Sequence, residues 1–170
     1  MHQTAHPGRR VLIVRLSRLI GSRYKERPAD AEPIYRAALE GCLRALGESS
    51  PYTSTAMVNL GTALTDLRRF DEAEPLIRRA LEQRRQAFGD DALETLHARV
   101  QLGTLLCERG DFRAAADEFS ALLEKVRRVM PPEHWYPAVV EGWYGRALAG
   151  LERFAEAEIG SFKIYGPVGC

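Results

Sequence analysis

Apolar and polar positions alternate along this chain with the period of an α-helix and not with that of a strand. From residue 28 to residue 165, apolar side chains recur at spacings of three and four, and short breaks rich in Gly, Pro and Asp separate the periodic stretches. The clearest stretch is residues 59–81, where LGTALTDL is followed by RRFDE and then by AEPLIRRAL. This pattern predicts a helix, a tight turn and a second helix.

The same arrangement returns at intervals of 42 residues. Glycine recurs in the middle of the first helix at positions 61, 103 and 145, phenylalanine at the turn at 70, 112 and 154, and alanine in the second helix at 73, 115 and 157. Glycine inside a helix costs about 1 kcal/mol relative to alanine, so its recurrence indicates a close helix crossing. We expect the alanines to be the matching small residues of that crossing.

A single amphipathic hairpin cannot bury its apolar surface, so repeated hairpins are expected to stack. We predict an all-α fold of eight helices in four antiparallel pairs, an α-solenoid. The expected division is a tail over 1–7, one array over 8–166, and a tail over 167–170. Within the array the pairs occupy about 8–46 (a degenerate repeat), 50–88, 91–130 and 133–166.

Local signals mark where these helices begin and end. Ser50 followed by Pro51 predicts an N-cap and a first helical residue, and Asp90 or Asp91 is the expected N-cap of the next pair. Gly47 lies directly after the helix that precedes Ser50. A residue with positive φ commonly ends a helix at this place, and glycine adopts that conformation readily.

The segments LGTAL and AEPLI, residues 60–64 and 73–77, resemble the two halves of the tetratricopeptide repeat. The signature tryptophan of that family is absent, with Met57, Arg99 and Glu141 in its place. The 42-residue period and the long second helix resemble the kinesin-light-chain type of this repeat. The resemblance covers about residues 28–165 and implies a right-handed superhelix whose concave groove, lined by the first helix of each pair, binds a peptide.

This resemblance places one stripe of groove residues on each first helix. The stripes are Thr55, Val58, Asn59, Thr62, Thr65 and Asp66; His97, Val100, Gln101, Thr104, Cys107 and Glu108; and Val139, Gly142, Trp143, Arg146 and Gly150. In the family, an asparagine before the conserved leucine commonly bonds the backbone of an extended ligand. Asn59 holds that place, and Gln101 and Trp143 are its equivalents. Arg146 is the only basic member, which argues against a carboxylate clamp that needs several Lys and Arg residues.

Composition argues against several other classes of protein. The 24 basic and 23 acidic residues give a net charge of +1, which is not the clear basic excess expected of a nucleic-acid-binding protein. The arginine pairs 68–69, 78–79, 84–85 and 127–128 are interleaved with acids and are interpreted as a solvated, ion-paired outer surface. No apolar run is long enough to span a membrane. The three cysteines have no paired spacing and indicate free thiols in a reducing, cytoplasmic compartment.

Two segments leave alternatives open. Residues 1–25 contain no acid and several arginines, so they are either a transit peptide or the first helix of the degenerate repeat, which we favour. The pairs Trp135-Tyr136 and Trp143-Tyr144 form an aromatic cluster that is either packed or a docking surface. The last predicted helix is apolar for a terminal repeat, which favours self-association through this end or a covering partner.

Catalysis finds no support in the sequence. The four histidines share no metal-binding spacing, and neither a phosphate-binding loop nor a nucleophile motif is present. We therefore expect no enzyme, no cofactor and no metal. The predicted function is a non-enzymatic module that binds a protein or peptide in its groove. The alternative is a structural or regulatory appendage, self-associating or docked to a kinase or transcriptional regulator.

Overall fold

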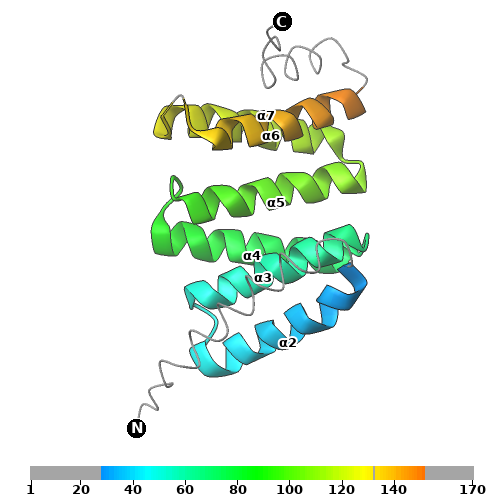
Figure 1. Ribbon diagram of the computed structural model, residues 1–170, viewed down its shortest axis with the longest axis vertical. Coiled ribbons are helices and arrows are strands. Elements are labelled where there is room, and N and C mark those ends of the chain that lie inside the picture. Colours follow the sequence, from blue (N-terminus) through cyan, green and yellow to red (C-terminus); the bar gives the residue numbers. More distant parts are fainter. Residues whose placement is uncertain (1–27, 132, 152–170) are drawn as a thin grey trace, which may run out of the picture. The chain divides into compact units, whose positions relative to one another are not determined.

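The computed structural model describes residues 28–131 and 133–151, and every regular element within them is a helix (Figure 1). These are α2 (Pro28–Leu46), α3 (Pro51–Asp66), α4 (Phe70–Phe88), α5 (Leu93–Arg109), α6 (Phe112–Val129) and α7 (Trp135–Gly150). The predicted all-α class is confirmed. The helices predicted before residue 28 and after residue 151 lie outside the described residues.

The chain divides between Ala87 and Phe88 into two compact units. The first unit contains α2, α3 and α4, apart from the last residue of α4, and the second contains α5, α6 and α7. In each unit, consecutive helices run antiparallel and pack against each other (Figure 1).

The linkers before α3 and α5 are closed by the same hydrogen bond. The hydroxyl of Thr53 donates to the carbonyl oxygen of Gly47 at 2.7 Å, and that of Thr95 donates to Gly89 at 2.8 Å. Both glycines have positive φ, 78° and 87°, a conformation that other residues rarely adopt. The prediction for Gly47 is confirmed, and the second bond repeats the first 42 residues later.

The two helix starts differ in how they are capped. Ser50 caps α3 as predicted, with its side chain accepting a hydrogen bond from the Tyr52 amide, and Pro51 follows. The prediction that Asp90 or Asp91 caps α5 is wrong, because Ala92 is the N-cap and makes no side-chain bond. Asp91 instead accepts a hydrogen bond from Lys125 of α6 at 2.7 Å, which holds the linker against that helix.

Gly61 and Gly103 lie at close crossings, but the neighbour differs from the one expected. A Cβ added to Gly61 would lie 2.5 Å from Cγ1 of Ile77, and one added to Gly103 would lie 2.5 Å from Cζ of Phe119. The side chain that fills the space is therefore one turn beyond the predicted alanine. Ala73 adds only its carbonyl oxygen, 3.4 Å from the Gly61 position.

At the three positions where the family has its signature tryptophan, the residues of this protein make two kinds of contact. Met57 is fully buried in the first unit. In the second unit, Arg99 of α5 binds Glu118 of α6 at 2.6 Å, and Glu141 of α7 binds Arg127 of α6. Partly buried ion pairs thus connect neighbouring helices where the family usually places an aromatic ring.

Candidate peptide-binding faces

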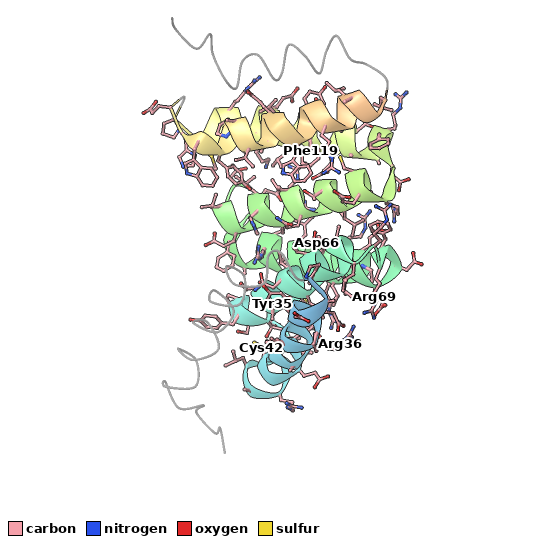
Figure 2. The ribbon with its side chains drawn as sticks, turned by 45° about the vertical axis from the view of Figure 1, so that its right-hand side comes forward. Tyr35, Arg36, Cys42, Asp66, Arg69 and Phe119 are labelled. Atoms are coloured by element: carbon pink, nitrogen blue, oxygen red, sulfur yellow. The ribbon has the colours of Figure 1, made fainter. Side chains whose placement is uncertain are left out.

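In the first unit, the predicted face belongs to α3. Thr55 and Asp66 are exposed and Asn59 and Thr62 are half-buried, whereas Val58 and Thr65 are buried. Burial raises the pKa of Tyr35 in α2, and the nearby carboxylate of Asp66 adds to this shift, so the end of this stripe lies close to α2 (Figure 2).

Hydrogen bonding distinguishes Asn59 from its neighbours on α3. The hydroxyls of Thr55 and Thr62 donate to carbonyl oxygens one turn earlier in their own helix, at 3.0 and 2.9 Å. Within the described part of the chain, the amide of Asn59 makes no hydrogen bond. An amide can donate and accept at once, which suits it to a peptide backbone.

In the second unit, α5 and α7 lie side by side and share one face (Figure 1). On α5, His97 is exposed, Gln101, Thr104 and Glu108 are half-buried, and the side-chain nitrogen of Gln101 lies 3.4 Å from the ring of His97. Val100 is buried. The middle of this face, formed by Gln101 and Thr104, therefore carries uncharged polar side chains.

Cys107 is also buried, although its position falls within the α5 stripe. Burial raises the pKa of its thiol to about 11, despite the opposing charge of Arg146. A raised pKa keeps the thiol protonated at neutral pH, which disfavours reaction as a nucleophile. Cys42 is likewise a free, buried thiol, as predicted for both.

On α7, the side chains form a connected group at the end of the face away from His97. Arg146 binds Glu108 of α5 at 2.7 Å, and its guanidinium lies 5.1 Å from the ring centre of Trp143. Trp143 stacks in turn on Phe119 of α6, with ring centres 6.4 Å apart; Figure 2 shows Phe119 between the ribbons of α5 and α7. Arg146 is half-exposed, and these contacts fix its direction.

The remaining predicted face residues of α7 differ in their exposure to solvent. Val139 and Gly142 are exposed. The space beside Gly150 is taken by the ring of Phe112, which comes from the start of α6. The predicted aromatic cluster also divides, because Tyr136 is buried and Trp143 half-buried, while Trp135 is exposed.

The outer surface carries the predicted ion pairs, with one exception. Arg78 binds Glu74 at 2.7 Å, and Arg36 and Arg69 share the carboxylates of Glu32 and Glu72 in a network that ties α2 to the start of α4 (Figure 2). The exception is Arg84. It was predicted to be solvated, but it is buried, with an exposed fraction of 5%.

The burial of Arg84 does not follow from the doubled arginine at positions 84–85. Its Nε lies 3.4 Å from Oγ of Ser54, and its Nη2 lies 3.3 Å from Oγ1 of Thr55, a predicted face residue. A signal was present in the repeat, since Arg84 falls 42 residues from Cys42 and from Val126, both buried. Position within the repeat, rather than the doubled arginine, predicts its burial.

Other kinds of site find no basis in the described residues. No group of His, Cys, Asp and Glu side chains gathers there in a way that could hold a metal ion. None of the helices in 28–131 and 133–151 is long and apolar enough to cross a membrane. The terminal helix predicted to self-associate lies outside the described residues.

Comparison with known proteins agrees with the repeat pattern. Two family models described as tetratricopeptide repeat match the chain, one over residues 22–76 and 52–128 and the other over residues 100–165. The crystal structure of BtubC (BKLC) from P. vanneervenii is similar, with a TM-score of 0.77 and 19% sequence identity. The match covers 99% of this chain and 70% of that chain, and at this identity it shows the fold alone. No curated protein matches the chain.

The family models extend from residue 22 to residue 165 and include both described units. Tetratricopeptide repeats are in general non-enzymatic scaffolds for protein interaction. The chain belongs to the tetratricopeptide repeat family.

Proposed function

We propose that this protein is a non-enzymatic interaction module that binds an extended segment of a partner protein along the faces of its first helices. In the first unit this face is that of α3, and in the second it is the shared face of α5 and α7. The observation that supports it most is Asn59, whose half-buried amide makes no hydrogen bond within the described chain. A ligand backbone supplies both partners that this amide lacks.

The chemistry of the faces fits a mixed, mostly neutral ligand. Thr62 and Thr104 hold equivalent positions on α3 and α5, and Gln101 is the equivalent of Asn59. Arg146 is the only Lys or Arg among the proposed residues, and Glu108 already shares its charge at 2.7 Å. A ligand terminal carboxylate would therefore meet one partly neutralised cation, which supports side-chain and backbone recognition rather than a carboxylate clamp.

The test begins by selecting binders from a library of random displayed peptides. Binding of the selected peptides is then measured for the Asn59→Ala, Gln101→Ala and Arg146→Ala variants. We expect the dissociation constant to rise by about tenfold in at least one variant, in line with a residue that contributes directly to binding. Thermal unfolding should be unchanged for Asn59→Ala, because no hydrogen bond within the described chain is removed.

The matched control is Arg78→Ala, which removes an exposed arginine and its ion pair with Glu74 from the second helix of the same repeat. We expect its affinity for the peptides to equal that of the wild type. Peptides that bind all three face variants with wild-type affinity, or a loss with Arg78→Ala instead, would show that the first-helix faces are not the binding site.

A further inference from the structure

The shared face of α5 and α7 carries one acid and one base, and they bind each other. Among the predicted face residues of these two helices, Glu108 and Arg146 are the only Asp, Glu, Lys or Arg. Nη2 of Arg146 in α7 lies 2.7 Å from Oε1 of Glu108 in α5. A hydrogen bond between charged groups is about twice as strong as one between neutral groups. The arginine that a ligand would meet on this face is therefore already bound to a carboxylate of the same protein.

A second contact holds the guanidinium of Arg146 independently of Glu108. Its central carbon lies 5.1 Å from the ring centre of Trp143, within the range of a cation–π interaction. Trp143 is stacked on the fully buried ring of Phe119, with the two ring planes only 11° apart, so the indole is itself fixed. Removing the charge of Glu108 should therefore leave Arg146 in place on Trp143.

Glu108 is the more buried partner of the pair. Its side chain has an exposed fraction of 28%, against 49% for Arg146. A ligand carboxylate that binds Arg146 must either displace Glu108 or lie beside it. Displacement leaves a half-buried carboxylate without its arginine, and the second arrangement brings two like charges together, so both cost free energy. An uncharged ligand group incurs neither cost.

We propose that Glu108 determines the specificity of the shared face, because it excludes partner segments that place Asp or Glu opposite Arg146. The segment that fits has an uncharged polar side chain there, such as the amide of Asn or Gln. A guanidinium carries five N–H donors, so an amide oxygen can accept from Arg146 while Glu108 stays bound. This role of Glu108 rests on the proposed function, since a face that binds no peptide has no ligand to select.

The test uses a peptide selected on the wild type from a random displayed library and weakened by Gln101→Ala or Arg146→Ala. Each of its positions in turn is replaced by Glu and, separately, by Gln, which has a similar shape and no charge. Fluorescence anisotropy measures the affinity of each labelled peptide. At the position opposite Arg146, we expect the Glu peptide to bind the wild type about tenfold more weakly than the Gln peptide. Glu108→Gln should remove most of this difference by strengthening the Glu peptide alone.

The matched control is Glu141→Gln. Glu141 of α7 is also a half-buried carboxylate bound to an arginine of a neighbouring helix, Arg127 of α6, so the changes in charge and pairing are alike. Glu141 is not a residue of the proposed face, and its variant should bind the Glu peptide as weakly as the wild type does. The double variant Glu108→Gln and Arg146→Gln should lose the gain, because the cation is gone. Unchanged affinity for the Gln peptide shows that Glu108→Gln is folded.

Three results would overturn the role of Glu108 and leave the proposed function standing. The first is a set of selected peptides that only Asn59→Ala weakens, since the shared face is then unused. The second is a Glu peptide that binds the wild type as tightly as the Gln peptide at every position, or a difference that Glu108→Gln does not reduce. The third is an equal gain in Glu141→Gln, which would reflect net charge alone. Peptides that no face variant weakens would instead contradict the proposed function, and the role of Glu108 with it.

Discussion

One core position of the repeat takes three side chains of different chemistry. Cys42, Arg84 and Val126 follow one another at 42-residue intervals, and all three are buried. Two of them need no polar partner, whereas the guanidinium of Arg84 lies within reach of the hydroxyls of Ser54 and Thr55 at the start of α3. A buried charge is expensive to desolvate, and charged hydrogen bonds offset that cost only in part. Arg84 therefore places a charged side chain at a position that is apolar in the other two repeats.

Replacement of Arg84 tests this view. Arg84→Ala leaves a cavity and removes a donor from two hydroxyls, so we expect the free energy of unfolding to fall by about 3 kcal/mol. Arg84→Met fills most of the same volume without a charge, and its loss should be smaller, about 1 kcal/mol. Urea unfolding of both variants measures the difference. A loss for Arg84→Met as large as that for Arg84→Ala would show that the charge itself is required.

Glycine is required at a crossing but not elsewhere in these helices. Gly103→Ala gains about 1 kcal/mol of helix propensity, but its Cβ would lie within 2.9 Å of three ring atoms of Phe119. Overpacking of this kind costs about 1–3 kcal/mol, so we expect a net loss of stability. Gly41 in α2 has no atom within 4 Å of an added Cβ, and Gly41→Ala should raise the free energy of unfolding. Urea unfolding that gives both variants the same sign of change would refute this account.

At the scale of the helices, the starts and ends followed from the sequence wherever a side chain marks them. Ser50 and Pro51 identified the start of α3, whereas α5 begins after Ala92, which leaves no polar signal to find. The nearest acid, Asp91, is used by Lys125 of α6. That contact joins residues 34 positions apart, so no local pattern could have revealed it.

The first-helix faces were predicted only in part, for a geometric reason. Spacings of three and four place Val58 and Val100 on the same stripe as Asn59 and Gln101, yet both valines are buried. Most of the surface of α3 and α5 is covered by neighbouring helices, so the open face is narrower than the stripe that a helical period defines. The width of an open face depends on packing between helices, which a single sequence does not display.

The missing cap of α5 can be supplied. Ala92 already has the extended backbone of an N-cap, with φ −67° and ψ 142°. Ala92→Ser would add a hydroxyl able to accept a bond from a free amide of the first turn, and should raise the free energy of unfolding by roughly 1 kcal/mol. Removing the equivalent cap of α3, by Ser50→Ala, should lower it by a similar amount. Thermal and urea unfolding together measure both, and a neutral Ala92→Ser would mean that water already satisfies these amides.

At the scale of the whole molecule, ion pairs between elements connect segments that hydrophobic burial does not fix. Arg79 of α4 donates to Glu48 in the linker before α3 at 2.6 Å, and Arg36 of α2 shares Glu72 with Arg69. In the second unit, Lys125 holds Asp91 in the same way. Each of these pairs anchors a linker or a turn, so their loss should loosen the linkers before it melts the helices.

These pairs give stability a definite dependence on pH. The hydrogen bond from Arg79 lowers the pKa of Glu48, that from Arg69 lowers the pKa of Glu72, and that from Lys125 lowers the pKa of Asp91. Each carboxyl keeps its ordinary value, 4.5 for Glu and 3.8 for Asp, when the chain is unfolded. The stabilisation is therefore present above these ordinary values, begins to decrease near pH 5, and is lost as the pH falls through the lowered folded values.

We expect the free energy of unfolding to be nearly constant from neutral pH to about pH 5 and to fall steadily below it. The triple variant Glu48→Gln, Glu72→Gln and Asp91→Asn should start lower at neutral pH and fall less on acidification, because these carboxylates no longer take up protons. Its matched control is Glu40→Gln, whose partner Arg44 lies 3.9 Å away in the same exposed helix surface. A triple variant with the same acid profile as the wild type would show that these pairs carry no pH-dependent stability, and that acid acts elsewhere in the molecule.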